Sequence, residues 1–126
     1  MKVLNLIIKQ KYFDAILQGR KVQEFRELRP ATYKRLVETD SEGFNIIDEN
    51  ENSIPIKYDA IRFFVGYNKN RDSALVEVLG AFCEVFVDEK GEPIQYEYGK
   101  GMWVAEQVVY NLGRILEKDI HEKSRV

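Results

Sequence analysis

The stretch Gly19–Arg26, GRKVQEFR, decides how the first part of this chain is organised. The residues before it, KQKYFDAILQ, place apolar side chains at helical spacing, and Gly19 is a natural C-terminal cap for a helix of about two turns. The residues after Gly19 favour a strand in which Glu24, Arg26 and Leu28 share one face. The stretch therefore predicts a helix that ends at Gly19 and a charged strand that follows at once. We expect Phe25 and Leu28 to supply the apolar contacts of that strand.

Other segments of the chain favour strands more often than helices. Residues 3–8, VLNLII, form a dense apolar run that is typical of a buried strand. Further strands are expected at 60–68, 73–87 and 102–119. A second short helix is expected within 31–38, and a helical start at 104–108 stays open. The pattern predicts the α+β class, as a small, partly open β-barrel with short helices packed at its ends.

Length and charge limit the possible organisation and partners. The 126 residues and 44% apolar content fit a single domain over 1–126. Residues 1–35 hold nine Lys and Arg against three Asp and Glu, a local charge of +6, whereas residues 36–57 have a local charge of −5. Because screened charges act over only about 8–10 Å, an anionic ligand is expected near the first 35 residues. The acidic balance of the whole chain argues against tight, non-specific binding of a nucleic-acid duplex.

Patterns typical of cofactor, metal and membrane sites are missing from the sequence. There is no Walker, GxGxxG or zinc-ligand pattern, so we expect no cofactor and no metal, and we find no internal repeat or low-complexity tract. Cys83 is the only cysteine, which fits a reduced compartment, and it is expected to be buried in a strand. The apolar run at 3–8 is too short for a signal peptide or a membrane span, so a cytoplasmic protein without a membrane partner is expected.

The charged stretch has the spacing G-x-K-x-x-E-x-R, formed by Gly19, Lys21, Glu24 and Arg26. Its position after one strand and one short helix, with the lead-in YFDAILQGRK, resembles the ASCH domain family of the PUA-like superfamily. The closing segment VVYNLGRILE is similar to the final strand of that family. The resemblance covers most of the chain, apart from a probable acidic insertion at about 38–57. It implies a PUA-like β-barrel with a cleft beside the motif that binds RNA, a nucleotide or a modified nucleoside.

The same resemblance implies an alternative function, because some members of the family are hydrolases. One group cleaves the acyl amide of N4-acylated cytidines with a Lys, a Thr and a Glu, and other members are ribonucleases. If this chain is an enzyme, the resemblance assigns catalytic roles to Lys21, Glu24 and Glu77. The Thr of the amidohydrolases is replaced here by Glu24, and no Ser or Thr lies between Lys9 and Arg29. Whether the chain is an enzyme is therefore left open.

Eight side chains are candidates for binding an anion or a nucleic acid: Lys9, Lys11, Arg20, Lys21, Glu24, Arg26, Tyr67 and Lys69. Arg26 carries a planar guanidinium group suited to phosphate. Lys9 and Lys11 stand where the first strand meets the helix, whose N-terminal backbone N–H groups attract anions. A structural reading stays open for the motif, in which Glu24 and Arg26 form an ion pair that closes the end of the barrel.

Aromatic side chains near these charges can stack a base. The candidates are Tyr12, Tyr67 and Trp103. A position in the core is the alternative for Tyr12 and Trp103, and it is the favoured interpretation for Trp103. The acidic residues 38–57 form a further feature, read as a hairpin that uses Phe44 and Ile46. This segment gives a third possible function, the binding of a protein partner.

Overall fold

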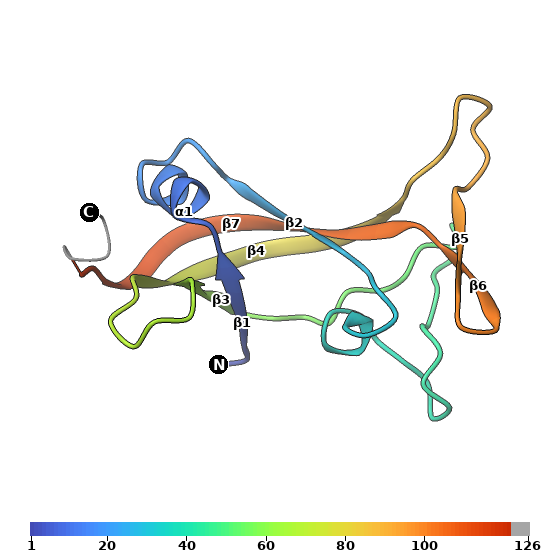
Figure 1. The fold of residues 1–126 in the computed structure, drawn as a ribbon, viewed down its shortest axis with the longest axis horizontal. Helices are drawn as coiled ribbons and strands as arrows, with labels where there is room; N and C mark the ends of the chain where they lie inside the picture. The colour runs from blue at the N-terminus through green and yellow to red at the C-terminus, as the bar shows by residue number, and fades with distance from the viewer. Residues whose placement is uncertain (122–126) are drawn as a thin grey trace. The chain divides into compact units, whose positions relative to one another are not determined.

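The computed structural model describes residues 1–121 of the chain. Its elements are β1 (Val3–Ile8), α1 (Gln10–Leu17), β2 (Gln23–Glu27), the 3-10 helix η1 (Tyr33–Arg35), β3 (Ala60–Val65), β4 (Ser73–Val85), β5 (Gln95–Tyr98), β6 (Gly101–Val104) and β7 (Glu106–Asp119) (Figure 1). The strands expected at 3–8, within 60–68 and within 73–87 are confirmed, as are β2 and the helix α1. The single strand expected at 102–119 is divided into β6 and β7, and β5 was not expected. The chain belongs to the α+β class. Within residues 1–121, no helix combines the length and the apolar composition needed to cross a membrane.

The strands form two sheets. The five-stranded sheet has the order β1-β3-β4-β7-β2, and β5 and β6 form a separate two-stranded sheet. The expected β-barrel is wrong, because the sheets do not close on themselves. The open helical start at 104–108 is wrong as well, since β7 begins at Glu106 and continues as a strand. The β-branched Val108 and Val109, both buried in β7, favour that extended backbone.

The chain divides into two compact units that alternate along the sequence. Among the described residues, the first unit contains residues 1–24, 57–80 and 111–121, and the second contains residues 25–56 and 81–110. Strands β2, β4 and β7 therefore each contribute residues to both units.

The first unit is built on a parallel pair of strands. β1 pairs with β3 in parallel, with Val3 opposite Ala60 and Ile8 opposite Val65, and β3 pairs with β4 in antiparallel orientation. α1 follows β1 and buries Phe13, as its helical spacing predicts. The apolar interior is completed by side chains of β3 and β4, including Phe63.

Helix α1 ends as its sequence predicts. Gly19 has φ of +74°, a left-handed conformation that glycine adopts without steric cost. The Gly19 N–H donates to the carbonyl of Ile16, and the N–H groups of Arg20 and Lys21 both donate to the carbonyl of Ala15. These bonds turn the chain tightly and place Lys21 directly before β2.

The second unit contains η1, the β5–β6 hairpin and a set of short loops. The short helix expected within 31–38 is a single 3-10 turn, η1 at Tyr33–Arg35. Leu28 is buried as expected, but Phe25 is 46% exposed, so the expectation that both supply apolar contacts is wrong for Phe25. The reason is strand alternation, because the face shared by Glu24 and Leu28 points inward.

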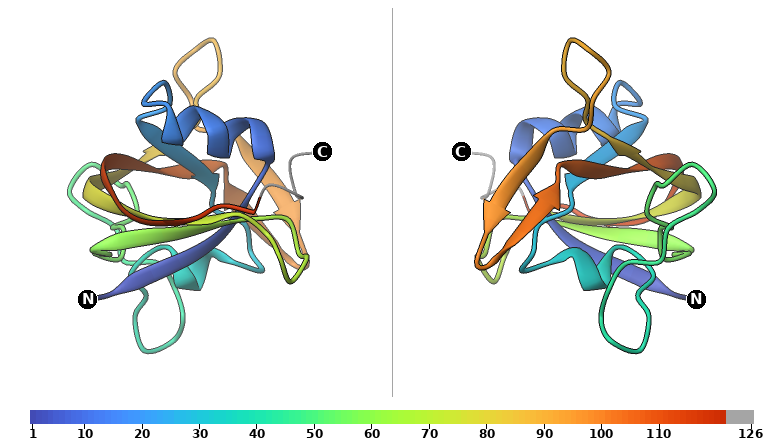
Figure 2. Two further views of the ribbon diagram at one scale, coloured as in Figure 1. Left: turned by 90° about the vertical axis from the view of Figure 1, so that its left-hand side faces the viewer. Right: turned by 90° about the vertical axis from the view of Figure 1, so that its right-hand side faces the viewer.

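Three loops of the second unit repeat one design, drawn as narrow loops in Figure 2. In each loop an aspartate carboxylate accepts hydrogen bonds from the backbone N–H groups two and four residues later. The bonds are Asp40 with Glu42 and Phe44, Asp48 with Asn50 and Asn52, and Asp88 with Lys90 and Glu92. The residue three positions after each aspartate has positive φ, and it is Gly43, Glu51 and Gly91 in turn. The sequence expectation of no internal repeat therefore missed a repeated turn.

Candidate functional site

One charged contact within the predicted motif joins Lys21 and Glu24. The Lys21 ammonium lies 3.3 Å from the Glu24 carboxylate, and Glu24 is only 6% exposed. Burial of a carboxylate is costly unless it is paired, and an ammonium group is a suitable partner. The turn after α1 supplies the lysine and β2 supplies the glutamate, so the local fold brings these two motif residues together.

Tyr12 extends the Lys21–Glu24 pair into an aromatic and cationic cluster. Tyr12 lies on α1 and is 44% exposed. The Lys11 Nζ lies 4.9 Å from the centre of its ring, and the Lys21 Nζ lies 5.7 Å from the same point. Both distances are within the range of a cation–π contact. We call Lys11, Tyr12, Lys21 and Glu24 the α1 cluster.

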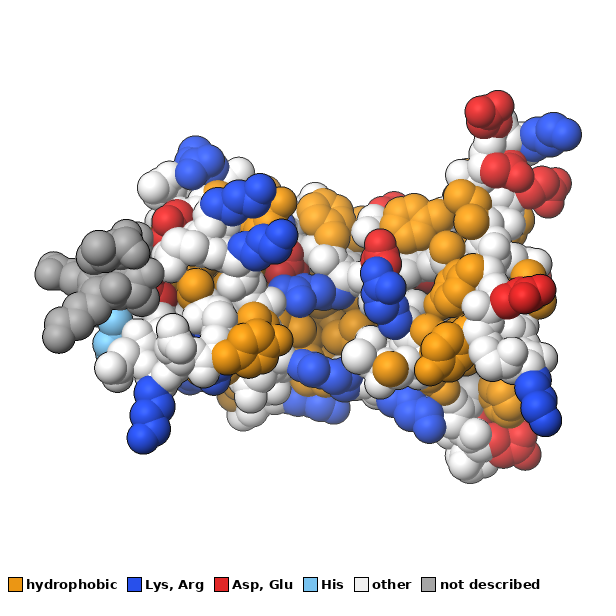
Figure 3. All heavy atoms as spheres, viewed as in Figure 1, with side chains coloured by type: hydrophobic (Ala, Val, Ile, Leu, Met, Phe, Trp, Pro, Cys, Tyr) orange, Lys and Arg blue, Asp and Glu red, His pale blue; other side chains and the backbone are white. Residues whose placement is uncertain are grey.

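The other predicted cations near α1 are also at the surface. Lys9 is the N-cap residue of α1 and is exposed, and the exposed Arg20 donates from Nε to the Gln18 side chain at 2.7 Å. Figure 3 shows Lys and Arg side chains gathered over α1 and the turn that follows it. This part of the first unit is therefore a cationic surface with one half-exposed aromatic ring.

Arg26, Tyr67 and Lys69 are the remaining predicted binding residues, one in β2 and two in a turn. Arg26 is a half-buried residue of β2 that belongs to the second unit, and its role in binding stays a prediction. Tyr67 and Lys69 belong to the turn between β3 and β4, where Tyr67 is 85% exposed. This turn contacts α1 at its end, where the Gln10 side chain of α1 donates a hydrogen bond to the Asp72 carboxylate at 3.3 Å. The binding role of Tyr67 and Lys69 also stays a prediction, and neither residue is part of the α1 cluster.

Glu77 has a different partner from the motif residues. Its carboxylate accepts a hydrogen bond from the Arg114 backbone N–H at 3.3 Å and lies 3.4 Å from the Arg114 guanidinium. These bonds lower the pKa of Glu77. The hydrogen bond from the Arg114 backbone makes the largest contribution, and the bond from its side chain makes the next largest. A carboxyl group with a lowered pKa is a poor proton donor at neutral pH. The Glu77 side chain also lies over Gly113, where an added Cβ would stand 2.5 Å from its Oε1.

Trp103 lies in an aromatic stack of the second unit. Its ring centre lies 5.4 Å from that of Tyr33 and 6.5 Å from that of Tyr98, and both pairs are T-shaped. Trp103 is partly exposed and sits on β6, beside β5. These contacts fit a structural role for Trp103 better than they fit stacking on a base.

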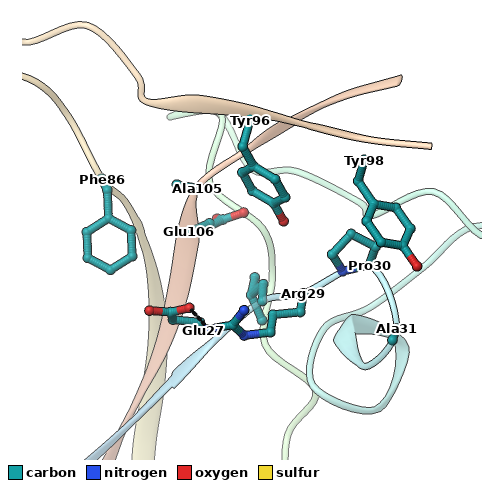
Figure 4. Close-up of a pocket in the computed structure, with 10 residues that line it drawn as sticks. Glu27, Arg29, Pro30, Ala31, Phe86, Tyr96, Tyr98, Ala105 and Glu106 are labelled. Atoms are coloured by element: carbon teal, nitrogen blue, oxygen red, sulfur yellow. Dashed lines mark hydrogen bonds and ion pairs between the residues drawn. The ribbon is translucent and has the colours of Figure 1, made fainter. Parts of the chain in front are cut away.

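A cavity of about 400 Å³ in the second unit was not expected from the sequence (Figure 4). Its wall is mainly apolar and aromatic, with three charged side chains among the lining residues. The lining residues are Glu27, Leu28, Arg29, Pro30, Ala31, Phe86, Tyr96, Tyr98, Ala105 and Glu106. We call it the Tyr96 pocket. One signal could have found it, because the alternation in Gln95–Tyr98, QYEY, places both tyrosines on one face of a strand.

The acidic segment 38–57 is anchored by a buried carboxylate that the sequence did not single out. Glu106 accepts from the Ser53 backbone N–H at 2.8 Å and from the Ser53 hydroxyl at 2.7 Å, and Asn45 donates to that hydroxyl oxygen at 2.8 Å. The predicted hairpin is a pair of short hairpins with bridges at Thr39–Asn45 and Ile47–Ser53. Binding of a protein partner through this segment stays a prediction.

The acidic side chains and the single cysteine bear on metal and thiol chemistry. Within residues 1–121, no three or more His, Cys, Asp or Glu side chains gather in a way that could hold a metal ion. Cys83 is buried, as expected. Burial raises the pKa of its thiol to about 12, with smaller contributions from Glu106 and Asp48. The thiol is therefore protonated at neutral pH, which makes it a weak nucleophile.

Comparisons of this chain with models of known protein families, with curated proteins and with solved structures found no match. The resemblance to the ASCH family therefore depends on the motif and its position in the sequence.

Proposed function

We propose that this protein binds a nucleotide or a short single-stranded RNA at the α1 cluster. The observation that carries the proposal is the half-exposed Tyr12 ring, which has the ammonium groups of Lys11 and Lys21 at 4.9 and 5.7 Å from its centre. The resemblance of the surrounding motif to the ASCH family supports the same ligand class. We expect the protein to act in the cytoplasm, in agreement with its single cysteine.

Each member of the α1 cluster has a distinct part in the proposed binding. A base stacks on the exposed face of Tyr12, an interaction typically worth about 1–3 kcal/mol. Phosphate groups beside that base lie within reach of Lys11 and Lys21, which act as hydrogen-bond donors and point charges. Glu24 holds Lys21 in place through the 3.3 Å ion pair. A short flexible strand suits this small surface better than a long duplex does.

The alternative of a hydrolase in the same place has less support. The ion pair with Glu24 engages Lys21 as a charged donor, whereas a nucleophilic lysine must be neutral. Glu77, the other catalytic candidate, is hydrogen-bonded to Arg114. We therefore propose binding ahead of turnover. Incubation with N4-acetylcytidine and with short RNAs tests this choice, and turnover that disappears in Lys21→Ala would favour the hydrolase.

Fluorescence anisotropy with a labelled single-stranded RNA of mixed sequence tests the binding proposal. Tyr12→Ala should weaken binding by about 5–150-fold, the range that corresponds to loss of one stacked base. Lys11→Ala should weaken binding less and should reduce the slope of log K against log salt concentration by about 0.7, as expected for one lost phosphate contact with a single strand. Circular dichroism melting should show that both variants remain folded, because both side chains are exposed.

Matched controls keep this experiment specific. Phe44→Ala removes an exposed aromatic ring from the second unit, and Lys90→Ala removes an exposed lysine from the Asp88 loop. Both controls should leave the affinity within about twofold of wild type, because they alter none of the α1 cluster. Equal losses in Tyr12→Ala and Phe44→Ala would contradict the proposed site.

A further inference from the structure

We infer that the Tyr96 pocket is a second ligand site, which takes a nucleobase carried by a nucleoside or a mononucleotide. The cavity of about 400 Å³ falls in the lower part of the roughly 300–1,000 Å³ range of small-molecule sites. All of its lining residues belong to the second unit, whereas the α1 cluster belongs to the first. The inference goes beyond the proposed function, since the pocket can hold a base whether or not RNA binds at α1.

Aromatic side chains give the pocket flat walls. Figure 4 shows Tyr96 extending from β5 toward Arg29, Tyr98 beside Pro30, and Phe86 on the opposite side of the hollow. Every base has an aromatic face, so stacking on such walls tolerates any of the bases. An aromatic wall therefore points to a planar ligand rather than to an aliphatic chain.

The wall formed by Tyr98 is held in position from behind. The Tyr98 ring is stacked edge-on against Trp103, and Trp103 is stacked in turn against Tyr33. The Tyr33 hydroxyl donates to the carbonyl of Gly43, which fixes the far end of this row. Side chains that are already ordered lose less conformational entropy when a ligand binds, so this arrangement favours affinity.

The polar groups of the pocket match the edge of a base. The carboxylate of Glu27 and the guanidinium of Arg29 lie 2.5 Å apart, and both side chains are more than half exposed. They offer an acceptor and a donor side by side, as do the hydrogen-bonding edges of nucleobases. An exposed ion pair contributes little to the stability of a fold, so its groups can turn toward a ligand at small cost. Glu106, by contrast, is engaged with Ser53.

The single tryptophan of the chain provides a direct assay. Because Trp103 contacts Tyr98, a ligand in the pocket should change its emission. Adenosine and cytidine are titrated with excitation at the red edge of the indole band, where the bases do not absorb. We expect a saturable change with both nucleosides and none with ribose 5-phosphate or inorganic phosphate, which lack the base. Isothermal titration calorimetry with the same probes measures the dissociation constants independently.

Variants of the pocket complete the test. Tyr96→Ala should raise the nucleoside dissociation constant by about tenfold or more, and Tyr96→Phe should keep it within a few-fold of wild type because the ring remains. Arg29→Ala changes an exposed side chain and should also raise the nucleoside dissociation constant. This variant provides the test if Tyr96→Ala fails to fold. Phe44→Ala, outside the pocket, is the control.

Two results would overturn the inference. The first is a wild-type protein with no saturable nucleoside response by either method. The second is a response that survives both Tyr96→Ala and Arg29→Ala. If RNA still binds in a Tyr12-dependent manner while nucleosides give neither response, the pocket inference alone fails. If nucleosides bind as expected and RNA affinity is unaffected by Tyr12→Ala, the proposed function alone fails.

Discussion

The ammonium of Lys21 lies 3.3 Å from the carboxylate of Glu24, although Glu24 is almost completely buried. A buried carboxylate at the start of a strand is unusual, because charged side chains are seldom fully buried unless they are paired. The neighbouring turn supplies that partner and leaves the lysine side chain partly exposed. The pair therefore links the stability of the first unit to the cationic surface around Tyr12.

Replacing Glu24 should measure this link. Glu24→Gln keeps the shape of the side chain but removes its charge, so we expect a loss of about 1–3 kcal/mol in the free energy of unfolding. The loss should not be larger, because the partly exposed Lys21 ammonium can turn toward water. Urea denaturation gives the value. Glu27→Gln is the matched control, since its exposed pair with Arg29 should change stability by less than about 1 kcal/mol. Equal effects of the two changes would contradict the structural role of Glu24.

The repeated aspartate loops predict a stabilising substitution. Glu51 has φ of +64° at the position where the other two loops have Gly43 and Gly91. A residue with a side chain is strained in this conformation, whereas glycine is not. Glu51→Gly should therefore raise the free energy of unfolding by about 0.5–1 kcal/mol.

Thermal melting of two variants tests that prediction. Gly91→Ala introduces the strain at the equivalent position and should lower the melting temperature, whereas Glu51→Gly should raise it. Changes of the same sign in both variants would show that backbone strain does not decide the stability of these loops.

Glu77 predicts a pH dependence of stability. Hydrogen bonds from Arg114 lower the pKa of Glu77 below its ordinary value of 4.5 in the folded protein. The unfolded chain therefore takes up this proton at a higher pH than the folded chain. The resulting stabilisation is present above about pH 4.5 and is lost as the pH falls through the folded pKa.

Urea midpoints measured at neutral pH and again below the ordinary pKa of Glu77 check the direction. Wild type should lose more stability on acidification than Glu77→Gln, which lacks the titrating group. Arg114→Leu should give an intermediate result, because the Arg114 backbone N–H, the main cause of the lowered pKa, remains. Identical acid responses of wild type and Glu77→Gln would contradict this account.

Local signals predicted much of the first unit. The apolar run of β1, the helical spacing of α1 and the cap at Gly19 act within a few residues, and all three are found where the sequence places them. The contact between Lys21 and Glu24 also follows from a short separation along the chain. Sequence reasoning works here because neighbouring residues determine both the turn and the start of β2.

Features that depend on distant pairing were predicted less well. A barrel forms only if the outer strands of a sheet pair with each other, which depends on residues far apart in the sequence. The prediction of a barrel was wrong because the five-stranded sheet ends at β1 and β2 without closing. The partner of Glu77 is 37 residues away, and the partner of Glu106 is 53 residues away. The Tyr96 pocket combines residues 27–31, 86, 96, 98 and 105–106, so no single window of sequence contains it.

The central claim is that the α1 cluster is the surface that meets RNA or a nucleotide. Two-dimensional amide NMR of the full chain, titrated with a short single-stranded RNA, tests it most directly. We predict that the largest shift changes fall at residues 9–12 and 20–24, and that they weaken together as salt is added. Shift changes confined to residues 38–57, or none at saturating RNA, would contradict the claim.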